Sequence, residues 1–219
     1  MKQMFANLFL ALAFIVAHSV APMTSDAFYR DPAPINTAAR PSAPSAVVAV
    51  YLQSPDFTVR EMKYRVFYNK GEVKRVPLTG YDFKASFTDE LVNALAEEKR
   101  MAWRPQSANE TIDVVGLLDG KVSPPKLEAD RLLLVNIAEY GAFLADLAAD
   151  KFYIMARFKL VERATGKKIW EKKLFERIDL EGKIADMQAD NQKGLKEGIN
   201  KVLEKVCVKL VAEMQKAKI

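Results

Sequence analysis

Histidine and cysteine are almost absent from this chain of 219 residues, since His18 and Cys207 are its only examples. His18 lies in an N-terminal segment that we expect to be removed, which would leave a chain without histidine. That excludes the Ser-His and Cys-His dyads of nucleophilic catalysis and removes the commonest zinc ligand. One cysteine forms no disulfide within a chain, so a hydrophobic core must stabilise the fold.

Glycine-rich phosphate loops, metal-ligand spacings and internal repeats are also lacking. The nine glycines are scattered, and none forms the pattern that cradles a phosphate. We therefore predict no catalytic residue, no cofactor and no metal, and expect a protein that is not an enzyme. Carboxylate-based hydrolysis of glycans needs neither histidine nor cysteine, and it remains the enzymatic alternative. The acids to inspect for it are Asp113, Asp119 and Glu139, which no motif links.

The N-terminus carries an apolar run behind a single positive charge. Lys2 precedes the uncharged stretch 8–17, and small residues follow at Ala17, Ser19 and Ala21. This pattern is typical of a signal peptide, here residues 1–21, because the run is shorter than the ~20 residues of a spanning helix. An uncleaved inner-membrane anchor is the alternative. No cysteine follows the run, so we expect a periplasmic or secreted protein that is not a lipoprotein.

Composition and charge indicate an ordinary globular domain behind a linker. Half of the residues are hydrophobic, the net charge is +5 and the pI is about 9.1. Residues 22–46 hold five prolines and read as a Pro-rich linker or disordered arm. Residues 47–219 suffice for a single α/β domain. The basic excess suits anionic lipid, cell-wall polymer or an acidic protein only weakly, and export excludes nucleic acid as an expected partner.

The hydrophobic pattern predicts an α+β fold, an α/β sandwich with a mixed or antiparallel sheet. Strands are expected at 47–52, 101–105, 130–143 and 152–162, with a hairpin over 60–78 that turns at 69–71 and a short strand within 111–122. A helix is expected over 87–100, capped by Ser86. A long C-terminal amphipathic helix should pack on the sheet, although a basic helix can also lie on a membrane. Cys207 flanks its apolar stripe and is expected in the core.

The stretch VERATGKKIWEKK, residues 161–173, predicts a hairpin rather than a basic binding patch. A three-residue loop, 164–166, puts Gly166 where the turn needs a positive φ. That register pairs Leu160 with Trp170 and Lys159 with Glu171. It also pairs Val161 with Ile169, Ala156 with Leu174, and Met155 with Phe175. A two-residue loop would instead place like charges opposite one another, which is unfavourable. Trp170 is therefore expected to be packed.

Two segments together resemble a known group of proteins. The run EADRLLLVNIAEYGAF carries Asp130, Ile137, Tyr140 and Gly141, and the hairpin carries Thr165, Gly166 and Trp170. With the C-terminal helix, they resemble the CsgG-like and TolB amino-terminal-like accessory proteins of Gram-negative envelopes.

The resemblance implies an α/β sandwich, a role in outer-membrane assembly, secretion or cell-wall synthesis, and no catalytic residues. We expect a non-enzymatic accessory protein of the envelope that binds another envelope protein. The alternative is a small-molecule or lipid-binding module with an apolar cleft between sheet and helix.

Overall fold

The computed structural model describes residues 44–65, 68–97, 100–145, 149–180 and 182–219. The expected signal peptide at 1–21 and most of the expected arm at 22–46 lie outside these residues. The arm was expected to run through residue 46, but Ser45 and Ala46 already belong to the first strand.

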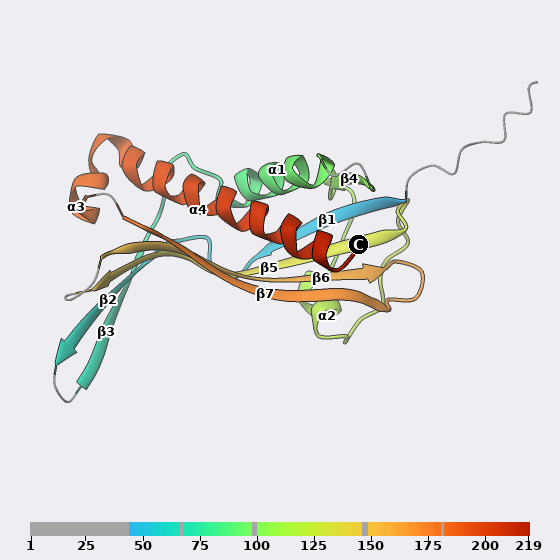
Figure 1. Cartoon of the computed structure of the whole chain (residues 1–219), viewed down its shortest axis with the longest axis horizontal. Coiled ribbons are helices and arrows are strands. Elements are labelled where there is room, and N and C mark those ends of the chain that lie inside the picture. The colour runs from blue at the N-terminus through green and yellow to red at the C-terminus, as the bar shows by residue number, and fades with distance from the viewer. Residues whose placement is uncertain (1–43, 66–67, 98–99, 146–148, 181) are drawn as a thin grey trace, which may run out of the picture. The chain divides into compact units, whose positions relative to one another are not determined.

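A seven-stranded mixed sheet organises the described chain and confirms the expected α+β class (Figure 1). Its strands are β1 (Ser45–Leu52), β2 (Phe57–Arg65), β3 (Tyr68–Val76), β4 (Ala102–Pro105), β5 (Arg131–Ala145), β6 (Lys151–Glu162) and β7 (Lys168–Asp179). β5 is the central strand. One of its edges pairs antiparallel with β6, which in turn pairs with β7. The apolar run that predicted β5 is buried because the strand has neighbours on both edges and packed layers on both faces.

The other edge of β5 pairs with two strands in succession. β1 runs parallel to the first half of β5, from Arg131 to Ile137, and β2 runs parallel to its last part, from Gly141 to Ala145. Between them the pairing is interrupted, and β5 carries a bulge between Ile137 and Glu139 at the same level. A bulge bends a strand and redirects its side chains. The sheet therefore has an opening where β1 ends and β2 begins.

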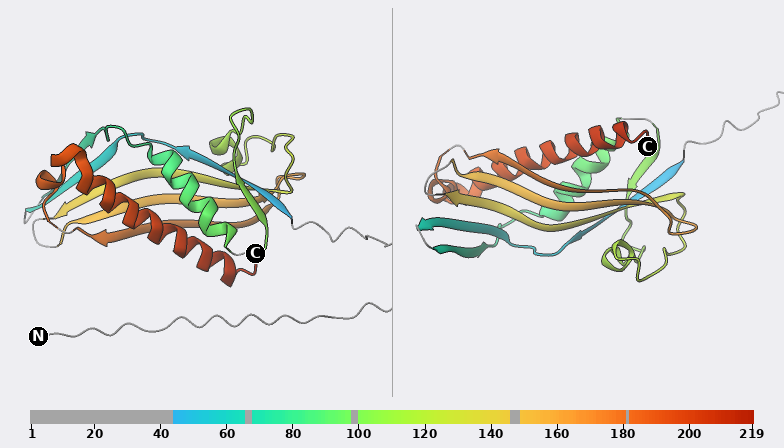
Figure 2. Two further views of the ribbon diagram at one scale, coloured as in Figure 1. Left: turned by 90° about the horizontal axis from the view of Figure 1, so that it is seen from above. Right: turned by 60° about the horizontal axis from the view of Figure 1, so that its bottom comes forward.

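Two helices cover one face of the sheet (Figures 1 and 2). α1 (Phe83–Ala96) and α4 (Ala189–Lys216) share a single core cluster with β1, β2, β5, β6 and β7, and α3 (Ile184–Met187) precedes α4. The predicted apolar stripe of α4 is buried, and Cys207 is buried beside it. Burial raises the pKa of the Cys207 thiol to about 12. α4 thus covers the sheet, as expected. Among the helices of the described residues, none is long and apolar enough to cross a membrane.

Ion pairs fasten α4 to β7, and Glu213 carries one of them. Its carboxylate accepts hydrogen bonds from Lys172 of β7, at 2.6 Å, and from Lys216, at 2.9 Å. These bonds lower the pKa of Glu213 from its ordinary 4.5 to about 2. A group with a depressed folded pKa stabilises the protein above its unfolded pKa, and that contribution disappears as the pH falls through the folded value.

Glu213→Gln should therefore unfold at a lower urea concentration than the wild type at pH 7. The difference should shrink as the pH falls from 4.5 towards about 2, because the wild type then loses the same charge. Urea unfolding curves at pH 7, 5 and 3 would measure it. The matched control is Glu197→Gln. Glu197 is exposed, and its ion pair with Lys193 on the same helix is long, at 4.0 Å, so it should contribute little to stability. A difference that stayed constant with pH would contradict the assignment to Glu213.

Three expected elements need correction. The first helix spans Phe83–Ala96 rather than 87–100, because Asp82, not Ser86, caps it by accepting a hydrogen bond from the Ala85 amide. Phe83 then extends the stripe of Phe87, Leu91 and Leu95 by one turn. The segment 111–122 contains no strand but a short helix, α2 (Val114–Leu118), which Asp113 caps. Residues 69–71 lie within β3 rather than in a turn, with Asn69 paired to Tyr64.

The predicted register of the β6–β7 hairpin is confirmed. Leu160 lies opposite Trp170, Lys159 opposite Glu171, Ala156 opposite Leu174 and Met155 opposite Phe175. Gly166 has a φ of +68°, as the turn requires. Trp170 is half-buried and packs against the core. Only the pair next to the turn differs: Val161 pairs with Lys168 rather than Ile169, because β7 bulges there.

Candidate interaction surface

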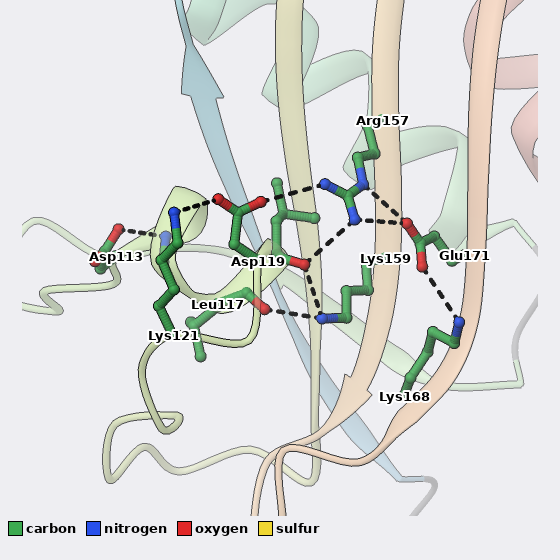
Figure 3. Close-up of polar contacts among 10 residues, drawn as sticks. Asp113, Leu117, Asp119, Lys121, Arg157, Lys159, Lys168 and Glu171 are labelled. Carbon is green, nitrogen blue, oxygen red and sulfur yellow. Dashed lines mark hydrogen bonds and ion pairs between the residues drawn. The ribbon is translucent and has the colours of Figure 1, made fainter.

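α2 covers one end of the second face of the sheet, where its buried residues pack on β1, β5 and β6. Basic side chains from β6 secure its C-terminal end (Figure 3). Lys159 donates to the carbonyls of Leu117 and Leu118, at 2.9 and 3.0 Å, and Arg157 contacts Asp119. The last carbonyls of a helix lack partners within the helix and carry partial negative charge, so cations stabilise them.

Beyond α2, the second face carries no helix among the described residues (Figures 1 and 2). β6 and β7 turn alternate side chains towards it, as the contacts of Lys159 and Arg157 with α2 establish. β2, β3 and β5 extend this surface past the opening in the sheet. We call it the bare face and define it by Arg60, Val73, Arg75, Ala138, Glu139, Phe143, Tyr153, Met155, Phe175 and Arg177.

An aromatic cluster forms the apolar centre of the bare face. Phe143 stacks on Tyr153 with ring centroids 4.2 Å apart, and Phe175 meets both edge-on at about 6 Å. The guanidinium of Arg177 lies 5.9 Å from the centre of the Phe175 ring. Tyr153 is fully buried, whereas Phe175 is 45% exposed. An exposed aromatic beside cations is typical of a surface that binds a partner.

Glu139 joins this cluster to the polar part of the bare face. Its carboxylate accepts two hydrogen bonds from Arg60, Nε to Oε1 at 2.6 Å and Nη2 to Oε2 at 2.5 Å, and a third from the Tyr153 hydroxyl. Burial opposes ionisation of Glu139, but these hydrogen bonds outweigh it and lower the pKa. Burial raises the pKa of Tyr153, whose hydroxyl therefore stays protonated and donating. The three groups hold one another in fixed positions.

The three acids considered for hydrolysis have separate partners. Asp113 caps α2 through the Gly116 amide at 2.8 Å, Asp119 pairs with Lys121 at 3.0 Å, and Glu139 binds Arg60 and Tyr153. Among the described residues, no hydrogen bond or ion pair joins one of these acids to another. Glu139, at the opening in the sheet, is the one that lies on the bare face.

The residues that carry the family resemblance lie at structural positions in the strands and turns. Asp130 accepts a hydrogen bond from the Ser45 amide at 2.8 Å, which ties the start of β5 to the start of β1. Tyr140 and Gly141 lie where β5 passes from β1 to β2. Thr165 and Gly166 form the β6–β7 turn, where the Thr165 hydroxyl donates to Glu162 and accepts from the Lys167 amide. None of these contacts involves the aromatic cluster.

A cleft between sheet and helix also exists. Its volume is about 720 Å³, and it lies between the ends of β6 and β7 and the α3–α4 region, with Phe152 and Ile178 among its lining residues. Seven of its thirteen lining residues are charged. An apolar ligand pocket has few polar groups, so this cleft does not have the composition that a lipid or small-molecule site was expected to show.

Sequence patterns missed most of the bare face. Met155 and Phe175 were predicted as a cross-strand pair, but not that this pair faces away from the helices. Arg60 and Glu139 are 79 residues apart, and the sequence patterns did not predict that they interact. The available signal was alternation: in β6 and β7, residues 153, 155, 175 and 177 share one face, and helix α4 contacts the other through Lys172 and Glu176.

Together these features define an α+β protein whose described helices leave part of one side of the sheet uncovered. No protein-family model and no curated protein matches the sequence. Solved structures do match. A DUF330 protein from Xanthomonas campestris covers 80% of this chain and 86% of its own, with a TM-score of 0.52 and 12% identity. A hypothetical protein from Chlamydia trachomatis covers 77% and 94%, with a TM-score of 0.46 and 14% identity. The first of these shows a shared fold and nothing more.

The similar structures correct one expectation. A lipoprotein from Neisseria meningitidis, 14% identical, covers 78% of this chain and 99% of its own at a TM-score of 0.36. A minor lipoprotein from Acinetobacter baumannii, 10% identical, covers 78% and 94% at 0.39. Both of these similar structures are named lipoproteins, and the expectation of a protein that is periplasmic or secreted and not a lipoprotein is withdrawn. That expectation rested on residues 1–21, which lie outside the described part of the chain. The resemblance to CsgG-like and TolB-like proteins stays a prediction.

Proposed function

We propose that this protein is a non-enzymatic accessory protein of the bacterial cell envelope and that it binds another protein through the bare face. The observation that carries the proposal is Phe175, which is 45% exposed at the centre of an otherwise packed aromatic cluster. Full burial of a large hydrophobic side chain contributes about 1.5–3 kcal/mol, so a partner that covers the exposed 45% of Phe175 would gain roughly half of that. Its neighbours Tyr153 and Phe143 hold it in place, so little side-chain entropy is lost on binding.

The assignment to the envelope rests on the sequence motifs, in particular Asp130, Tyr140, Gly141 and the hairpin residues Thr165, Gly166 and Trp170. The proposal does not depend on how the N-terminal segment is processed or attached.

Site-specific photo-crosslinking in cells of the source organism tests the proposal. A photoreactive amino acid at Ala138, an exposed position within the bare face, should give a discrete crosslinked adduct. In that background, Phe175→Asp should reduce the adduct at least about tenfold, because the centre of an interface carries most of its energy.

Val208 supplies the matched control. It is the most exposed large hydrophobic residue of the described chain, at 62%, and it lies on α4, which covers the other face of the sheet. A photoreactive residue at position 208 should give no such adduct, and Val208→Asp should leave the adduct at Ala138 unchanged. Equal labelling from both positions, or no adduct from Ala138, would overturn the proposal.

A further inference from the structure

The opening in the sheet forms a small cavity on the bare face. β1 ends at Leu52, β2 begins at Phe57, and the bulge of β5 displaces Ala138 at the same level. The resulting cavity has a volume of about 280 Å³. Its lining includes Ser54 from the connection, Arg60 from β2, Arg75 from β3, and Ala138 and Glu139 from β5. The cavity adjoins the aromatic cluster, because Tyr153 donates to Glu139.

The charges in this cavity do not cancel. Both hydrogen bonds of the Arg60–Glu139 pair are made within it, so Arg60 and Glu139 neutralise each other. Arg75 lines the same cavity, and no described side chain forms an ion pair with it. The positive charge of Arg75 acts on Glu139 at longer range and helps to lower the pKa of that carboxyl group. Two guanidinium groups thus face one carboxylate, which leaves an excess of one positive charge.

A buried hydroxyl also belongs to a residue that lines this cavity. The Oγ of Ser54 is inaccessible to solvent and has no hydrogen-bond partner among the described residues. Buried hydroxyls are normally satisfied, so an unsatisfied one in a cavity wall calls for an explanation. A hydroxyl and a guanidinium with free N–H groups both donate hydrogen bonds. Because the Ser54 hydroxyl is inaccessible from the open cavity, the guanidinium of Arg75 is the donor that a ligand with one negative charge would meet.

We propose that this cavity binds the carboxylate of an acidic side chain from the protein that covers the bare face. The inference rests on the proposed function and adds the chemistry of the partner: an acidic residue next to an apolar segment. A carboxylate supplies the single negative charge that balances Arg75. A phosphate dianion would add a second charge beside Glu139, and like charges at that range repel. The apolar neighbour of the carboxylate would cover Phe175, and Val73, 52% exposed, stands beside Arg60.

Titration of the full chain with sodium acetate tests the cavity without any partner. In nitrogen-15 NMR spectra, the Arg75 Nε–H and Ser54 amide signals should shift saturably with acetate. Arg75→Gln should abolish the saturable shift of the Ser54 amide, whereas Arg75→Lys, which keeps the charge, should retain part of it. Sodium chloride at the same ionic strength should produce no saturable change. A linear shift that chloride reproduces would mean an adventitious ion only and would overturn the site.

Photo-crosslinking from Ala138 tests whether the carboxylate comes from a protein. Arg75→Gln should reduce the adduct at least about tenfold, and Arg75→Lys should reduce it less. Saturable acetate binding with an unchanged adduct would overturn the partner assignment, because the cavity would then bind a free carboxylate. If Phe175→Asp removed the adduct while Arg75→Gln did not, the proposed function would survive and the carboxylate site would fail. Absence of any adduct in the unmutated protein would instead remove the proposed function itself.

Discussion

Replacement of Gly141 by alanine is expected to lower the free energy of unfolding by about 3 kcal/mol, at the upper end of the usual cost of overpacking. A Cβ at position 141 would lie 1.8 Å from the carbonyl oxygen of Thr58. That oxygen belongs to the main chain of β2, which pairs with β5 at this residue. A side chain could rotate away, but a paired strand must move as a whole. Urea unfolding should measure the loss, and hydrogen exchange should show faster exchange in β2 and β3.

Gly80→Ala is the matched control for Gly141→Ala. Gly80 has a φ of +65°, and an added Cβ would meet nothing within 4 Å. Alanine there should therefore cost only the strain of a left-handed residue, about 1 kcal/mol. Equal losses in the two variants would mean that the close approach of β2 to β5 does not require glycine.

The register of the β6–β7 hairpin was predictable because its determinants are local. Side-chain charges and one glycine, all within about twenty residues, excluded the alternative loop. The ion pair that suggested the register is nevertheless absent from the contacts of the described residues. Lys159 donates to the carbonyls of α2, and Glu171 binds Arg157 at 2.8 Å. The sequence did not reveal α2, so the true partner of Lys159 could not be anticipated.

The candidate surface was less predictable because its parts are far apart in the chain. The alternation of side chains along a strand predicts that Tyr153 and Phe152 lie on opposite faces of β6. It does not predict which of these faces the helices cover. That choice depends on where α1 and α4 pack, which is a property of the whole core. The opening in the sheet also needs two distant irregularities at one level, the β1–β2 connection and the bulge at 138. Neither has a sequence signal comparable with that of a turn glycine.

Tyr140 and Gly141 are adjacent in the segment that carries the family resemblance. In the structure, both residues lie beside the opening in the sheet. Gly141 allows β2 to approach β5. Tyr140 packs towards the helices, where its ring stacks on Phe83 of α1 with centroids 3.8 Å apart and planes 2° apart. Its hydroxyl donates to the carbonyl of Pro55, in the connection between β1 and β2, at 2.5 Å. Burial raises the pKa of Tyr140, so the hydroxyl remains a donor.

Tyr140→Ala should therefore destabilise the protein by about 3–5 kcal/mol, the usual cost of removing a buried aromatic side chain. Tyr140→Phe keeps the stacked ring and loses only the hydrogen bond to Pro55, so it should cost about 1 kcal/mol. Urea unfolding of both variants separates the two contributions. The phenylalanine variant should also speed hydrogen exchange at the Gln53 amide, which bonds to the Ile137 carbonyl at 3.0 Å in the same connection. If Tyr140→Phe cost as much as Tyr140→Ala, the hydroxyl rather than the ring would hold the connection in place. The opening next to Ser54 and Arg75 would then depend on one hydrogen bond, and acetate binding should fail in that variant.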